Sequence, residues 1–213
     1  LPSTIMQNFA KVTTTTTDTV TGIFDSNAAL FTFNPKEITV DNEDPGFRII
    51  ESNQKNKLQS FFKKESEDKY KNLNFWMPPS KWTATIGVNY YGDYINSAVY
   101  KKSGSGSNKT EWTTQIQIPG FYEVFVYTSE LPMMGWRRRG SEEKKMQYYT
   151  VKHDDGEEEI SVETGRGRQG WMTLGSFYFS AGEAKITLSD KGSESNQIIF
   201  ADAVKWVYTN NNK

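Results

Sequence analysis

One segment of the chain brings an imidazole next to carboxylates. His153, the single histidine, is followed directly by Asp154 and Asp155. Such a trio could perform acid-base catalysis or bind a metal ion. A nucleophilic triad would need an activated serine, but the chain has no Gly-x-Ser-x-Gly elbow, and a zinc site would need more nitrogen or thiolate ligands. We therefore interpret Asp154 and Asp155 as turn residues whose side chains bond to the backbone, and we expect no catalytic residue.

A second segment, residues 165–170, matches the glycine pattern of dinucleotide-binding proteins. That fingerprint requires a preceding strand and a following helix, whose N-terminus receives the pyrophosphate. Here the next residues, from Trp171 onward, are aromatic and extended in character, so we interpret the match as a hairpin loop. Arg166 and Arg168 in this loop could still grip a carboxylate or a sulfate, and Trp171 follows as a stacking surface.

A carboxylate interrupts an apolar pattern near the end of the chain. Within residues 197–208, alternate side chains are apolar except at Asp202. A buried carboxylate must be compensated. One interpretation is that Asp202 accepts hydrogen bonds from backbone N–H groups or from a Trp or Tyr side chain and fixes the closing strand. The alternative is a structural calcium site in which Asp202 acts with carbonyl oxygens and with Asp41 or Glu43, because calcium takes oxygen ligands.

The best candidate for a ligand-binding surface is the loop at residues 131–140. It combines two methionines and Trp136 with a run of three arginines that includes Arg137 and Arg138. An aromatic ring can stack against a sugar, and arginines can grip the carboxylates of an acidic glycan. The competing interpretation is a solvated loop whose Trp136 only covers the edge of the fold. Tyr90, Tyr91 and Tyr94 form a second candidate stacking surface, for which interior packing is the alternative.

The elements that position these residues are predicted to be strands. Of the 213 residues, 36% are hydrophobic and 14% aromatic, so the apolar area is concentrated in large rings that suit sheets. After residue 79, runs rich in Val, Ile, Thr and aromatic residues end at Gly, Asn, Ser or Asp, as in sandwiches and barrels. The nine predicted strands cover residues 82–86, 95–101, 110–118, 122–128, 146–153, 158–163, 171–179, 184–189 and 197–208.

The first part of the chain is more mixed. Residues 1–35 include five threonines in a row and are interpreted as a polar tether or peripheral strand. Two short strands are predicted at residues 38–40 and 47–50, on either side of a Pro-Gly turn. From residue 54 to residue 70, apolar side chains at helical spacing predict one short amphipathic helix. Residues 209–213 form a polar tail.

Composition excludes several classes of protein. The formal net charge is −1, so no overall field would attract nucleic acid. The chain has no apolar run near the ~18 residues that span a bilayer, and no cysteine for disulfides or thiolate sites. Because the chain begins at Leu1 rather than methionine, we expect a processed or trimmed product.

Residues 36–208 resemble the golvesin C-terminal domain, a family that also occurs in xanthan-lyase-like proteins. The closing half carries the specific motifs, with weaker ones before it. The matching segments are Ile38–Asn42, Pro45–Phe47, Trp82, Tyr91–Gly92, Gly104–Ser107, Gly120–Val124, His153–Gly156, Gly170–Trp171, Leu174–Phe179 and Ala201–Val204. The chain departs from the family in carrying insertions at about 51–81 and 129–145, either of which could cover or rebuild a binding face.

The resemblance implies an all-β, jelly-roll-like antiparallel β-sandwich, to which the residues add one short inserted helix. It also implies a non-catalytic accessory module of a secreted or surface bacterial protein. We expect such a module to bind polysaccharide or a cell-surface glycan and to need no cofactor. The alternative is a structural domain that docks onto neighbouring domains of a larger protein without binding glycan.

Overall fold

The computed structural model describes residues 21–25, 28–32, 36–52, 69–129, 145–165 and 167–209. For residues 21–25 and 28–32 only the backbone is described. Across these ranges all regular structure is strand, in fourteen elements. The predicted helix at residues 54–70 falls almost wholly outside the described part. No helix in the described ranges is long and apolar enough to cross a membrane.

One layer is a five-stranded antiparallel sheet in the order β10-β9-β12-β7-β4. Its strands alternate between buried residues and partly exposed ones, which is the pattern of a sheet with one face on the core. The strands of this layer are β4 (Phe47–Ile50), β7 (Lys109–Ile116), β9 (Lys145–His153), β10 (Gly156–Thr164) and β12 (Gly182–Gly192).

The second layer is a four-stranded antiparallel sheet in the order β11-β8-β14-β3. In β8, Tyr122, Val124 and Val126 are buried, and the residues between them face away from the core. The chain's last described strand therefore lies inside the sheet, between β8 and β3. The strands of this layer are β3 (Glu37–Val40), β8 (Gly120–Thr128), β11 (Gly170–Phe179) and β14 (Val204–Thr209).

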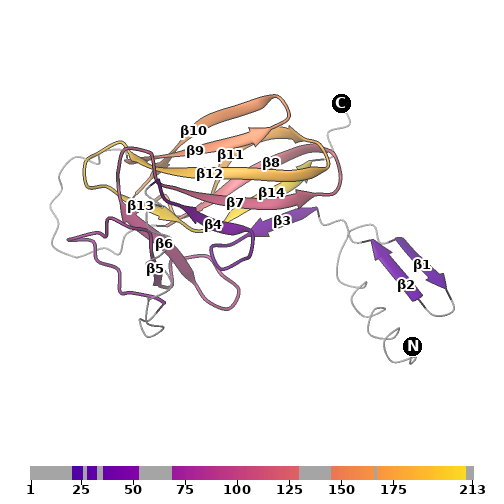
Figure 1. Cartoon of the computed structure of the whole chain (residues 1–213), viewed down its shortest axis with the longest axis horizontal. Helices are drawn as coiled ribbons and strands as arrows, with labels where there is room; N and C mark the ends of the chain where they lie inside the picture. The colour runs from indigo at the N-terminus through magenta and orange to yellow at the C-terminus, as the bar shows by residue number, and fades with distance from the viewer. Residues whose placement is uncertain are drawn as a thin grey trace.

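A smaller three-stranded sheet in the order β13-β6-β5 adjoins one end of the sandwich (Figure 1). It has its own cluster of buried residues, formed around Tyr90, Tyr100 and Phe200. Its strands are β5 (Thr83–Ile86), β6 (Ser97–Lys102) and β13 (Ile198–Ala201). Within the region interpreted as a tether, β1 (Thr21–Asp25) and β2 (Ala28–Thr32) pair only with each other in the described part.

The main core lies between the two larger sheets, which Figure 1 shows as stacked layers. Trp112 and Tyr149 come from the five-stranded sheet, and Tyr122 and Trp206 come from the four-stranded sheet, each with at most 2% of its surface exposed. Trp112 and Tyr149 lie 6.5 Å apart between ring centroids. Large rings thus fill the interior, as the aromatic content predicts. The predicted all-β, jelly-roll-like antiparallel sandwich is confirmed.

The sequence prediction for residues 197–208 is wrong in one respect. The single expected strand is two, because β13 ends at Ala201 and β14 begins at Val204, in different sheets. Asp202 and Ala203 form the step between them, and both are buried. The apolar alternation on either side of Asp202 therefore belongs to two separate surfaces. The loop at residues 165–170 likewise joins β10 and β11 of different sheets rather than closing a hairpin.

Candidate functional site: an aromatic face on the four-stranded sheet

Aromatic rings gather on the outer face of the four-stranded sheet. Trp171 on β11 lies directly opposite Tyr127 on β8, so both side chains share that face. Their ring centroids are 5.3 Å apart in a T-shaped arrangement. Phe125 lies two residues along β8 on the same face, because successive strand residues alternate in direction. Each of these rings is half-buried.

Tyr91 joins this group from the loop between β5 and β6. Its ring centroid lies 5.2 Å from that of Trp171 and 5.7 Å from that of Tyr127. Two hydrogen bonds hold the neighbouring chain segments together. The side-chain amide of Gln169 donates to the carbonyl of Asn89, at 3.2 Å, and the hydroxyl of Thr128 donates to the carbonyl of Arg168, at 2.5 Å. The three rings thus form one cluster built from two strands and a loop.

A lysine completes the surface. The Nζ of Lys205 on β14 lies 4.5 Å from the ring centroid of Trp171 and 5.6 Å from that of Phe125. It also lies 3.4 Å from the Oε1 of Glu37 on the neighbouring strand. We call Tyr91, Phe125, Tyr127, Trp171 and Lys205 the aromatic face. This face offers flat apolar rings and a cation. The adjacent carboxylate of Glu37 can also form hydrogen bonds with a ligand.

Asp202 supports this face from inside the fold. Only 1% of its surface is exposed. Its carboxyl group accepts hydrogen bonds from the backbone N–H of Tyr91 at 3.2 Å and from the hydroxyl of Ser129 at 3.0 Å. The indole N–H of Trp112 donates to its backbone carbonyl at 3.1 Å. The expected hydrogen bond from a backbone N–H is therefore present, and it fixes the loop that carries Tyr91.

Burial raises the pKa of Asp202 well above its ordinary value. The hydrogen bonds from Tyr91 and Ser129 act against this rise, and the nearby charge of Asp41 adds to it. Burial also raises the pKa of Asp41, to about 7. In both carboxyl groups burial shifts the equilibrium toward the neutral form, because transfer of a charge out of water is costly.

The calcium hypothesis would use this same pair. In the described ranges, no group of three or more His, Cys, Asp or Glu side chains is gathered closely enough to hold a metal ion. Glu43, the third carboxylate considered, accepts a hydrogen bond from the hydroxyl of Ser97 and forms an ion pair with Lys69. The carboxyl groups of Asp202 and Asp41 each accept a hydrogen bond from a backbone N–H, that of Tyr91 and that of Asn42 respectively. A calcium ion bound at Asp202 and Asp41 stays a prediction.

The other candidate residues are placed as follows. Arg168 lies before Trp171 in the connection between β10 and β11, and its guanidinium lies 3.4 Å from a carboxylate oxygen of Glu163. Arg166 lies outside the described residues, as do Trp136, Arg137 and Arg138. Their roles in ligand binding stay predictions. Of the tyrosines, Tyr90 is buried, Tyr91 belongs to the aromatic face and Tyr94 is exposed.

The histidine segment occupies the turn between β9 and β10. The side chain of Asp154 accepts a hydrogen bond from the backbone N–H of Ser180 at 2.9 Å, so it ties this turn to the end of β11. The ring of His153 packs against Phe177, with 5.1 Å between centroids. This arrangement fits the interpretation of Asp154 as a residue that shapes the turn.

Sequence reasoning missed Phe125, Tyr127 and Lys205. The segment 121–127 is apolar at nearly every position, a pattern typical of a strand that is covered on both faces. In the structure β8 is central within its sheet, but Phe121 is 45% exposed and Phe125 and Tyr127 are half-buried. The outward alternation of aromatic residues at 121, 125 and 127 is the signal that could have found this surface.

A sequence profile described as the Golvesin C-terminal domain matches residues 69–208. The chain belongs to the Golvesin C-terminal domain family. This golvesin-type chain is similar in structure to a xanthan lyase from Paenibacillus, at 20% identity over 84% of this chain and 14% of the lyase, with a TM-score of 0.56. It also matches the GH26-CBM35 β-(1,4)-mannanase of Podospora anserina, at 12% identity over 63% of this chain and 27% of the mannanase, with a TM-score of 0.39.

The likeness to the xanthan lyase bears on the fold alone. The golvesin-type chain spans about one seventh of the length of the xanthan lyase. No match to a curated protein was found.

Proposed function

We propose that this chain is a non-catalytic accessory module that binds carbohydrate on the aromatic face. The observation that carries the proposal is the cluster of Tyr91, Tyr127 and Trp171, whose centroids lie 5.2 to 5.7 Å apart on the outside of the sandwich. Sugar rings present flat patches of C–H groups that pack against aromatic rings. Rings set by strand register and by a hydrogen-bonded loop lose little conformational entropy when a ligand binds.

Polar groups beside the rings suit the hydroxyls of a sugar. The ammonium of Lys205 can donate hydrogen bonds, and the carboxylate of Glu37, 3.4 Å from it, can accept them. A ligand that stacks on Trp171 would be able to form hydrogen bonds with both Lys205 and Glu37. Aromatic surface with a few convergent polar groups is the usual composition of a small-molecule site.

The family and the structural likeness to a lyase support an accessory role outside the cell. The chain belongs to the Golvesin C-terminal domain family, and it resembles a small part of a much longer xanthan lyase. We infer that it is appended to a secreted or surface-attached bacterial protein and holds that protein close to polysaccharide. Within the described ranges, the one imidazole packs against Phe177 and its neighbour Asp154 is engaged by Ser180, which supports a role without catalysis.

The proposal is tested by calorimetry with a panel of neutral oligosaccharides. Trp171→Ala should weaken binding at least about tenfold, because aromatic anchors dominate binding energy. Trp76→Ala is the control, since it removes an exposed tryptophan that lies outside the aromatic face. Equal loss in both variants, or release of reducing ends from a polysaccharide by the purified chain, would contradict the proposal.

A second candidate function, docking onto a neighbouring protein domain, is favoured by one observation. The loop between β5 and β6 exposes Val88 at 94%, Tyr94 at 99% and Ile95 at 44% of their surfaces. Exposed apolar side chains gathered on one loop can mark an interaction site. Hydrogen exchange in this loop should then be slower in the parent protein than in this chain alone, and equal exchange would exclude docking at this loop.

A further inference from the structure

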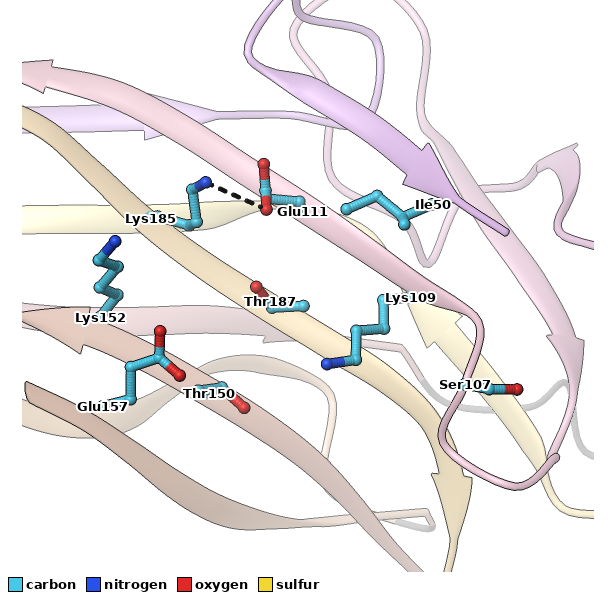
Figure 2. Close-up of a pocket in the computed structure, with 9 residues that line it drawn as sticks. All are labelled: Ile50, Ser107, Lys109, Glu111, Thr150, Lys152, Glu157, Lys185 and Thr187. Atoms are coloured by element: carbon cyan, nitrogen blue, oxygen red, sulfur yellow. Dashed lines mark ion pairs between the residues drawn. The ribbon is translucent and has the colours of Figure 1, made fainter. Parts of the chain in front are cut away.

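An open groove lies on the other side of the sandwich, on the outer face of the five-stranded sheet (Figure 2). Its volume is about 470 Å³, which is within the range of small-molecule sites. Side chains from β4, β7, β9, β10 and β12 line it, and none of the lining side chains is aromatic. The groove therefore offers a ligand charge and hydrogen bonds rather than stacking.

The base of the groove is a buried carboxylate. The side chain of Glu111 on β7 is only 6% exposed, and its Oε2 lies 3.4 Å from the Nζ of Lys185 on β12. Arg48 on β4 forms a second ion pair with the other oxygen of Glu111. Figure 2 shows Lys185 reaching along the sheet to Glu111. Lys185 also lies 3.6 Å from the Oε1 of Glu183, so two carboxylates balance these two cations and any excess positive charge comes from the other lysines of the groove.

Two further lysines line the groove, and one of them, Lys152, lies directly opposite Glu157 on β10. Lys109 and Lys152 are exposed, and neither makes an ion pair with any residue in the described part of the chain. Lys152 lies directly opposite Lys185 in the pairing of β9 with β12. Like charges at directly opposed positions destabilise a sheet. A bound anion between these strands would relieve that repulsion.

Hydroxyl groups lie between the lysines. Thr187 on β12 is opposite Thr150 on β9 and opposite Glu111 on β7, so it occupies the middle of the groove. The threonine hydroxyls can both donate and accept hydrogen bonds, as the hydroxyls of a sugar require. Glu157, opposite Lys152 on β10, adds a carboxylate at one end.

The combination of lysines, threonine hydroxyls and carboxylates in the groove favours some anionic ligands over others. A densely charged phosphate backbone would be repelled by the carboxylates of Glu111 and Glu157 and would need more cations than the groove has. A chain with single carboxylates separated by hydroxyl-bearing rings would offer one anion to each of the two lysines and hydroxyls to the two threonines. We propose that the groove binds an acidic oligosaccharide, with its carboxylates at Lys109 and Lys152 and its hydroxyls at Thr150 and Thr187. This site is separate from the aromatic face and does not depend on it.

The test compares binding of a galacturonate tetrasaccharide with binding of its methyl ester by calorimetry. The esters keep the sugar rings and remove the charges. The acid should bind, and more weakly in high salt, because the screened interactions lie at the surface. Lys109→Gln and Lys152→Gln should each raise the dissociation constant about tenfold, since a charge-assisted hydrogen bond is lost.

Lys81→Gln is the matched control, because Lys81 is also exposed but lies outside the groove. An unchanged or raised Tm of Lys152→Gln would show that the fold is intact, since the substitution removes repulsion with Lys185. The inference is overturned if the methyl ester or a single-stranded DNA binds as tightly as the acid, if the acid does not bind, or if Lys81→Gln weakens binding equally. Loss of acid binding in Trp171→Ala would instead place it on the aromatic face and would also overturn the groove. Binding of neutral sugars tests the aromatic face independently.

Discussion

The backbone N–H of Tyr91 donates a hydrogen bond to a carboxyl oxygen of Asp202 over 3.2 Å, between residues 111 positions apart in the chain. The half-buried residue Tyr91 is therefore positioned by a group in the interior. The same carboxyl accepts from Ser129, at the end of β8 that carries Tyr127. Stability and ligand binding are expected to depend together on this one side chain.

Asp202→Ala should lower the free energy of unfolding by about 2–4 kcal/mol, because it leaves two buried donors without an acceptor. Asp202→Asn should cost less, since an amide keeps one acceptor oxygen and resembles the neutral acid. Urea unfolding followed by tryptophan fluorescence measures both. Asp155→Ala, at an exposed turn, serves as the control. A cost below about 0.5 kcal/mol for Asp202→Ala, the range of ordinary surface changes, would contradict the role assigned to Asp202.

The pH dependence of stability should carry a contribution from Asp41. Burial raises its pKa from 3.8 to about 7, with the charges of Asp44, Glu43 and Asp93 adding to the effect and the N–H of Asn42 opposing it. Between these two pH values the folded state binds more protons than the unfolded state, so stability falls as the pH rises. The contribution is fully present below the unfolded pKa and is lost as the pH passes about 7.

Asp41→Asn removes this titration. The free energy of unfolding of the variant minus that of the wild type should therefore increase across that pH interval. The substitution also removes the Asp41 charge that adds to the raised pKa of Asp202, which changes the difference in the same direction. Unfolding experiments at several pH values measure it, and a difference that does not change with pH would refute the assignment.

A buried ion pair joins β6 to the end of β12. Lys101 and Asp190 are 2% and 0% exposed, and Asp190 also accepts hydrogen bonds from the backbone N–H of Gly106 and the amide of Asn108. Lys101→Ala should destabilise the fold by about 3–5 kcal/mol, because it leaves a buried charge without its partner. Lys102→Ala, at the exposed neighbouring position, should have little effect. Thermal unfolding of the two variants gives the comparison, and similar Tm values would disprove the expectation.

Gly92 follows Tyr91 at a position that no other residue fits. Its φ is 145°, and a Cβ there would lie 2.1 Å from the carbonyl oxygen of Ile95. Gly92→Ala should weaken sugar binding at the aromatic face and lower stability by more than the ~1 kcal/mol of a backbone effect alone. Gly182→Ala is the matched control, since its φ is 139° with no atom within 4 Å of the added carbon. Equal effects of the two substitutions would show that the contact with Ile95 is unimportant.

Local pattern was enough to predict most strands, because period-two alternation and turn residues act over a few positions. The predicted run at 146–153 agrees with β9 and that at 171–179 with β11, apart from one residue at an end. The period-two alternation predicted one continuous strand through Asp202, whereas the chain passes there from one sheet to another. Such a step depends on contacts with Tyr91 and Ser129 that are remote in sequence.

The candidate site was predictable only in part for the same reason. Trp171 was chosen because it follows a glycine-rich loop, and it does lie in the aromatic cluster. Its partners Tyr127 and Lys205 could not be assigned, because strand order decides which residues share a face. The groove residues were missed because isolated lysines and threonines on separate strands carry no motif. These residues come together in one groove only through the strand register, which places Lys152 opposite Lys185.

The position of β14 between β8 and β3 has a consequence for biosynthesis. Until residues 204–209 leave the ribosome, β8 and β3 have no strand between them, and each presents an unpaired edge. The layer that carries the aromatic face can therefore assemble only after residues 204–209 have been made, and nascent chains that stop before them should be prone to aggregation and dependent on chaperones.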